Sequence, residues 1–168
     1  MTDDSGVMTN FRKILELLEQ GEINFIVVGG LAAAAHGTAR STSDVDVVYA
    51  RDADNIRRLA AALAPHSPYL RGAPPGLPFR FDEKTIAMGL NFTLRTDLGD
   101  VDLLGEIVGG GKFEDLLPRS VEMTLYGTKC LCLDIPALIR AKRAAGRPKD
   151  LEAIAELEAL LAEKENGV

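Results

Sequence analysis

Two β-prone runs of this sequence carry aspartates at positions where a strand would normally carry only apolar or neutral residues. Asp44-Val45-Asp46 opens the first run, and Val101-Asp102-Leu103 lies in the second. Because side chains alternate along a strand, Asp44 and Asp46 share one face, and the apolar neighbours of all three acids turn to the opposite face. If the two strands are adjacent, Asp102 joins the other two carboxylates. The pattern therefore predicts an α/β chain with an acidic cluster on its sheet.

Three carboxylates held close together need a compensating charge. Like charges repel, and aspartate is a poor strand former, so the arrangement favours a bound cation. Hard oxygen ligands of this kind suit Mg²⁺ or Mn²⁺. Two such ions, roughly 3.5–4 Å apart, stabilise the attacking and leaving oxygens in phosphoryl or nucleotidyl transfer. We therefore take Asp44, Asp46 and Asp102 as candidate catalytic and metal-ligating residues.

The third acid has a competitor two residues earlier in the chain. Asp100 lies on the same strand face as Asp102, so alternation alone does not separate them. We prefer Asp102 because Val101 and Leu103 flank it, whereas Asp100 sits at the turn after Asp97-Leu98-Gly99.

A pair of glycines precedes the first two acids. Ile23 to Val28 predicts a strand that ends at Gly29-Gly30, and the alanine-rich run from Leu31 to His36 predicts a short helix. Such a turn brings backbone close to a ligand and presents amides to phosphate at a helix N-terminus. Gly-Gly and Asp-x-Asp are each common in surface turns, but their order along consecutive strands favours a nucleotide and metal site.

The remaining patterns complete a mixed sheet flanked by helices. Residues 65–81 hold five prolines and two glycines, so we expect a long loop and interpret it as a possible flap on the substrate side. The other predicted elements are a helix at Thr9–Gln20, a helix opening at Asp52, a hairpin of Asn91–Thr96 with Asp100–Leu104, strands Val121–Leu125 and Cys130–Leu133, a helix at Pro136–Ala145, and a last helix from about 148–150.

Length and charge limit the classes of protein that fit. The 168 residues suit one domain spanning 1–168, with a core over about 9–134 and a helical part over about 135–164. The net charge of −6 argues against bulk DNA binding. A basic patch near Lys142, Arg143, Arg147 and Lys149 could contact nucleic acid locally, although a solvated helix face is the more common explanation of such a cluster taken alone.

No long apolar stretch occurs, so we expect no membrane association and a cytoplasmic protein. Met1 to Ser5 is acidic and lacks the basic region of a signal peptide. Cys130 and Cys132 are predicted to be reduced core residues, because neighbours at this spacing rarely form a disulfide.

Taken together, these motifs resemble the nucleotidyltransferase superfamily, which includes the DNA polymerase β-like enzymes. The resemblance rests on Gly29-Gly30, Asp44-Val45-Asp46 and Val101-Asp102-Leu103, and it implies the nucleotidyltransferase fold, with the C-terminal helices packed on the sheet. Lys142, followed by Arg147-Pro148-Lys149-Asp150, is similar to motifs of the small AbiEii-type toxins.

The resemblance implies roles for individual residues. The three aspartates would bind metal, and Asp102 would also help to activate the acceptor hydroxyl. An NTP would be the substrate, contacted by a wider set of residues: Gly29, Gly30, Ser43, Arg40, Lys142, Arg147 and Asp150. Gly-Gly stands where the family often has Gly-Ser, so Ser41 or Ser43 would supply the missing hydroxyl. Arg40 and Asp150 also fit simpler explanations, a solvated side chain and a helix cap.

The function expected from this resemblance is transfer of NMP from an NTP to a hydroxyl. The AbiEii-type branch implies a toxin with a tRNA 3′ end as acceptor and an antitoxin protein as partner. Two alternatives remain: a nucleotide-sensing domain without turnover, and a small-molecule transferase of the aminoglycoside type, for which the chain looks short.

Overall fold

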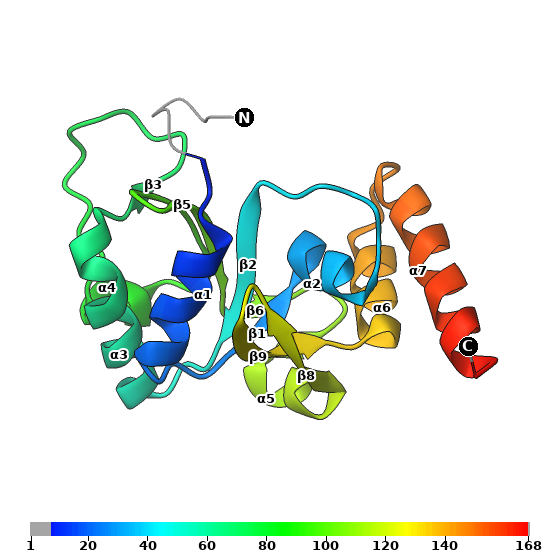
Figure 1. Cartoon of the computed structure of the whole chain (residues 1–168). Helices are drawn as coiled ribbons and strands as arrows, with labels where there is room; N and C mark the ends of the chain where they lie inside the picture. Colours follow the sequence, from blue (N-terminus) through cyan, green and yellow to red (C-terminus); the bar gives the residue numbers. More distant parts are fainter. Residues whose placement is uncertain (1–7, 168) are drawn as a thin grey trace.

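A seven-stranded mixed sheet organises the chain (Figure 1). The computed structural model describes residues 8–167, so the acidic start at Met1 to Ser5 lies outside the described residues. The sheet has the spatial order β3-β4-β5-β2-β1-β9-β8. Its strands are β1 (Phe25–Val28), β2 (Asp44–Tyr49), β3 (Tyr69–Leu70), β4 (Phe92–Thr96), β5 (Gly99–Leu104), β8 (Ser120–Leu125) and β9 (Thr128–Leu133).

The strand that carries Asp44 and Asp46 lies at the centre of this sheet. β2 pairs antiparallel with β1 and parallel with β5, and the parallel register places Asp46 opposite Asp102. β4 and β5 form the predicted hairpin, and the two predicted strands β8 and β9 also pair antiparallel. The predicted adjacency of the two aspartate-bearing strands is thus confirmed.

Helices and two minor strands complete the fold. The larger helices are α1 (Phe11–Gln20), α2 (Gly29–His36), α3 (Ala53–Leu63), α6 (Ile135–Ala145) and α7 (Asp150–Glu165). The shorter elements are the 3-10 turns η1 (Ala64–His66) and η2 (Leu117–Arg119), the helices α4 (Glu83–Met88) and α5 (Phe113–Leu116), and the small hairpin of β6 (Glu106–Ile107) with β7 (Gly111–Lys112).

The apolar faces of β2 and β5 are buried as alternation predicts. Val45, Val47, Val101 and Leu103 are all fully buried and belong to the hydrophobic core. Burying four such side chains from two adjacent strands strongly resists a shift in register, because a slip of one residue would turn the carboxylates into the core. The core therefore holds the acidic face in place.

The C-terminal helices begin and end where the sequence predicts. Pro136 lies in the first turn of α6, and Gly146 ends the helix in the left-handed conformation, with φ of 66°. α7 then packs beside α6 at the outer edge of the molecule (Figure 1). This arrangement brings the start of α7 back toward the end of α6.

The proline-rich segment is more ordered than a simple loop. Within residues 65–81, Tyr69 and Leu70 form the edge strand β3 and pair with β4. The prediction of loop throughout this segment is wrong at these two positions. The prolines on either side concealed the strand, which they can flank because β3 is an edge strand and pairs with only one neighbour. α4 was not predicted because six residues are too few to show a helical period.

Two smaller predictions can also be compared with the structure. Cys130 and Cys132 are free and buried in β9, as expected. Among residues 8–167, no helix combines the length and the apolar character that crossing a bilayer requires.

Candidate active site

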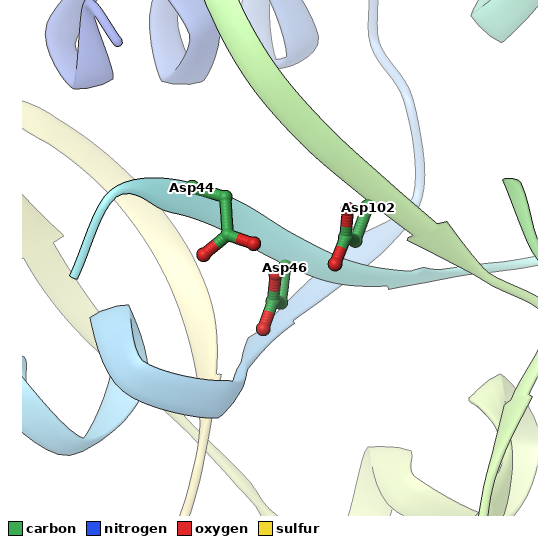
Figure 2. A group of neighbouring side chains, drawn as sticks. All are labelled: Asp44, Asp46 and Asp102. Atoms are coloured by element: carbon green, nitrogen blue, oxygen red, sulfur yellow. The ribbon is translucent and has the colours of Figure 1, made fainter. Parts of the chain in front are cut away.

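The three predicted aspartates meet on the face of the sheet opposite the core. Figure 2 shows Asp44 and Asp46 on β2 and Asp102 on the adjacent β5, with their carboxylates directed toward one another. One oxygen from each residue lies within 4.8 Å of the others. This spacing lets a single divalent cation contact all three carboxylates.

The electrostatics of the cluster fit a cation. Burial, together with the neighbouring charges of Asp44 and Asp102, raises the pKa of Asp46 to about 8. Burial also raises the pKa of Asp102. Oδ1 of Asp46 is buried and accepts no hydrogen bond from the described residues. A buried acceptor without a donor, beside two further carboxylates, is the environment that a hard divalent ion would satisfy.

Gly29 allows the first turn of α2 to approach Asp46. Gly29 has φ of +66°, and a Cβ at this position would lie 2.3 Å from Oδ2 of Asp46. Both observations exclude a larger residue without rearrangement. Gly30 is similarly restricted, because a Cβ there would lie 3.1 Å from Thr42. α2 begins at Gly29 itself, two residues earlier than predicted, so both glycines belong to its first turn.

Thr42 lies next to Gly30 and Asp44. Oγ1 of Thr42 lies 3.2 Å from the carbonyl of Asp44 and 3.3 Å from Oδ1 of the same residue. Ser43 is exposed, and its carbonyl accepts a hydrogen bond from Thr9. The sequence analysis considered Ser41 and Ser43 but missed Thr42, whose closeness to Gly30 depends on how the chain folds back.

Arg71 is the other site residue that the sequence analysis missed. It follows β3 and lies 2.9 Å from Oδ1 of Asp102 and 3.3 Å from Oδ2 of Asp100. Both acids thus have the same cationic partner, and the cluster that can hold a metal contains Asp102. No local signal marks Arg71, because it stands in a segment predicted as a loop some thirty residues before these acids.

A cleft of about 480 Å³ opens beside the acidic cluster. Gly29 and Asp46 line one side of it, and Lys142 and Arg147 line another. Its other walls are mainly apolar: Val28, Leu104, Ile107, Val108, Leu133, Leu138, Ala141 and Ala145. Asn91 and Glu106 complete the lining, so the cleft combines acidic side chains, a basic part at Lys142 and Arg147, and apolar walls.

Asp150 fixes the basic end of this cleft. It is buried and accepts hydrogen bonds from Arg147 at 2.9 and 3.3 Å, while Nζ of Lys142 lies 3.6 Å away. The hydrogen bond from Arg147 and the charge of Lys142 lower the pKa of Asp150. The structure thus brings these three predicted residues together.

Arg40 lies elsewhere. It forms ion pairs with Glu152 at 2.7 Å and Glu156 at 3.6 Å, both on α7. These contacts attach the loop between α2 and β2 to the outer helix, and they do not include any residue of the acidic cluster.

Two solved structures share this fold. One is a candidate nucleotidyltransferase from Thermotoga maritima, with 18% identity and a TM-score of 0.56 over 96% of this chain and 99% of that chain. The other is the lincosamide antibiotic adenylyltransferase LnuA with lincomycin bound, with 15% identity and a TM-score of 0.60 over 91% of this chain and 99% of that chain. No protein-family model and no curated protein match the sequence. The predicted nucleotidyltransferase fold is therefore confirmed.

The raised pKa of Asp46 predicts how stability depends on pH when metal is chelated. Between about pH 4 and about pH 8, the unfolded chain releases the proton of Asp46 and the folded site keeps it, so this group's stabilising contribution is lost as pH rises. Asp46→Asn removes that loss. We expect the melting temperature of the variant to exceed that of the natural chain increasingly up to about pH 8. The prediction is contradicted if the melting temperatures of the two chains change with pH in the same way. Asp54→Asn, which changes an exposed carboxylate, is the control.

The close approach of Gly29 to Asp46 makes a second prediction. Gly29→Ala should displace the Asp46 carboxylate and abolish the rise in melting temperature that a saturating concentration of Mn²⁺ causes in the natural chain. Gly76→Ala is the matched control, because Gly76 also has positive φ, at +92°, but a Cβ there would meet nothing within 4 Å. If both variants keep the Mn²⁺ response, the steric argument for Gly29 is wrong.

Proposed function

We propose that this chain is a metal-dependent nucleotidyltransferase that transfers NMP from an NTP to a hydroxyl acceptor. The observation that supports the proposal most directly is the convergence of Asp44, Asp46 and Asp102 beside the Gly29 turn and the cleft. A chain with the same fold, LnuA, is described as an adenylyltransferase, which agrees with this chemistry.

The proposed metal ligands are the three aspartates, and the ion is Mg²⁺ or Mn²⁺. When bound, it would neutralise charge on the phosphates and stabilise the leaving pyrophosphate. The amides of the first turn of α2, at Gly29 and Gly30, are free to donate to phosphate oxygens because a helix N-terminus leaves them without intrahelical partners. Lys142 and Arg147 supply positive charge across the cleft for the same triphosphate.

The chemical step follows from these positions. The acceptor oxygen would attack the α-phosphorus, and the bond from that phosphorus to pyrophosphate would break. Asp102 would take the proton released by the acceptor hydroxyl.

The observation that supports an RNA acceptor is a local group of basic residues. Lys142, Arg143, Arg147 and Lys149 gather at the junction of α6 and α7, next to the cleft, in a chain with net charge −6. We propose the tRNA 3′ end as one acceptor, with the protein acting as a toxin that an antitoxin restrains. This proposal rests on the resemblance to AbiEii-type proteins.

A small-molecule acceptor is the second candidate, and one observation favours it. LnuA acts on a lincosamide antibiotic by its description, and 91% of this chain covers 99% of LnuA. The length of this chain is therefore no argument against a small acceptor. The apolar walls of the cleft suit such a molecule as well as they suit a nucleobase.

Nucleotide-dependent stabilisation is the first test of the proposal. Mg²⁺ with one of the four NTPs should raise the melting temperature of the natural chain by about 5–10 °C at ligand concentrations near 100 Kd. Asp44→Asn/Asp46→Asn should remove this shift and abolish transfer of label from the NTP to RNA, protein or small-molecule acceptors.

Asp46→Asn alone separates transfer from sensing. It should abolish turnover if the chain is an enzyme. If it changes only NTP affinity, and the natural chain transfers no label to any acceptor, the nucleotide-sensing alternative holds instead.

Growth of a bacterial host tests the toxin role. Expression of the natural chain should slow growth, and expression of Asp44→Asn/Asp46→Asn at the same level should not. Normal growth with the natural chain, once its fold and triphosphate binding are confirmed, would reject the toxin role and direct attention to small acceptors.

A further inference from the structure

Arg71 is held next to the acidic cluster by its own backbone and side chain. Its amide donates to the carbonyl of Thr93 at 3.0 Å, which extends the pairing of β3 with β4 by one hydrogen bond. Its Nη2 also donates to the carbonyl of Leu94 at 2.8 Å. The side chain is 23% exposed. Arg71 is therefore a fixed part of the sheet edge and not a freely moving surface residue.

The guanidinium contacts three acids of the cluster face. Nη2 lies 2.9 Å from Oδ1 of Asp102, Nε lies 3.3 Å from Oδ2 of Asp100, and Nη1 lies 3.8 Å from Oδ2 of Asp44. Two of these acids, Asp44 and Asp102, are also proposed metal ligands. Asp44 and Asp102 thus already form ion pairs with a cation of the protein itself, the Arg71 guanidinium.

Among the described residues, Asp46 is the acid of the metal cluster that forms no ion pair with Arg71. Its Oδ1 accepts no hydrogen bond from the described residues, and Asp46 lines the cleft together with Gly29. A divalent ion bound by Asp46, Asp44 and Asp102 would lie close to the guanidinium that shares two of those ligands. Charges of the same sign at such short distances repel strongly in a partly buried site.

We propose that Arg71 is an internal counter-cation that competes with the divalent ion for Asp44 and Asp102, so that strong metal binding requires the phosphates of the NTP. The inference rests on the proposed metal site. Arg71 stabilises the acids while metal is absent and weakens the binding of metal alone. A triphosphate adds negative charge that offsets the combined positive charge. By linkage, metal and NTP then strengthen each other's binding by the same factor.

Mn²⁺ binding to the full chain, measured by calorimetric titration without and with an NTP, tests this role. Arg71→Met should bind Mn²⁺ alone roughly tenfold more tightly or better, and it should show a smaller gain in affinity when NTP is added. Metal-free Arg71→Met should melt at a lower temperature than the natural chain. Arg71→Gln, which keeps an amide donor, should shift Mn²⁺ affinity in the same direction if Arg71→Met does not fold.

Two further variants serve as controls. Arg71→Lys keeps the charge and should bind Mn²⁺ about as the natural chain does. Arg80→Met removes the same charge from an exposed position later in the chain segment that follows β3. It should leave Mn²⁺ affinity unchanged.

The result distinguishes this inference from the proposed function. Tighter Mn²⁺ binding by Arg71→Met supports it even if the natural chain transfers no nucleotide. Unchanged or weaker binding overturns it even if transfer is demonstrated. Absence of Mn²⁺ binding in both chains overturns it together with the metal site.

Discussion

Parallel pairing of β2 with β5 sets Asp46 beside Asp102 and Asp44 beside Asp100, so four carboxylates share one face of the sheet. Their mutual repulsion would separate two free strands. Here it is opposed by the buried apolar residues on the other face of the same strands. The hydrophobic core thus maintains an arrangement that electrostatics alone would disfavour, and Arg71, like the proposed metal ion, would relieve the repulsion between the acids.

The rest of the site is arranged around this acidic face. Gly29 brings the N-terminus of α2 against Asp46, so amide donors for an anion lie next to ligands for a cation. Nucleotide transfer needs both kinds of group, because the triphosphate is an anion that binds together with its metal ion. On the far side of the cleft, Asp150 holds Lys142 and Arg147 in position, so the α6–α7 junction contributes directly to the proposed nucleotide site.

Position in the sheet explains why one of two equivalent acids belongs to the cluster. Asp100 and Asp102 lie on the same face of β5, and local pattern does not distinguish them. The structure places Asp102 opposite Asp46, whereas Asp100 lies opposite Asp44 at the start of β5. Position in the sheet, not residue type, therefore assigns the third acid.

The sequence by itself determined the local features: the face on which each aspartate lies, the glycine turn before α2, and the helix boundaries at Pro136 and Gly146. These depend on residues a few positions apart, through strand alternation and backbone preference. Only the tertiary structure decided that Thr42 and Arg71 belong to the site and that Arg40 pairs with α7. The contacts of Arg71 and Arg40, and the approach of Thr42 to Gly30, join residues of different elements, and they depend on strand order and chain reversal, which no local pattern records.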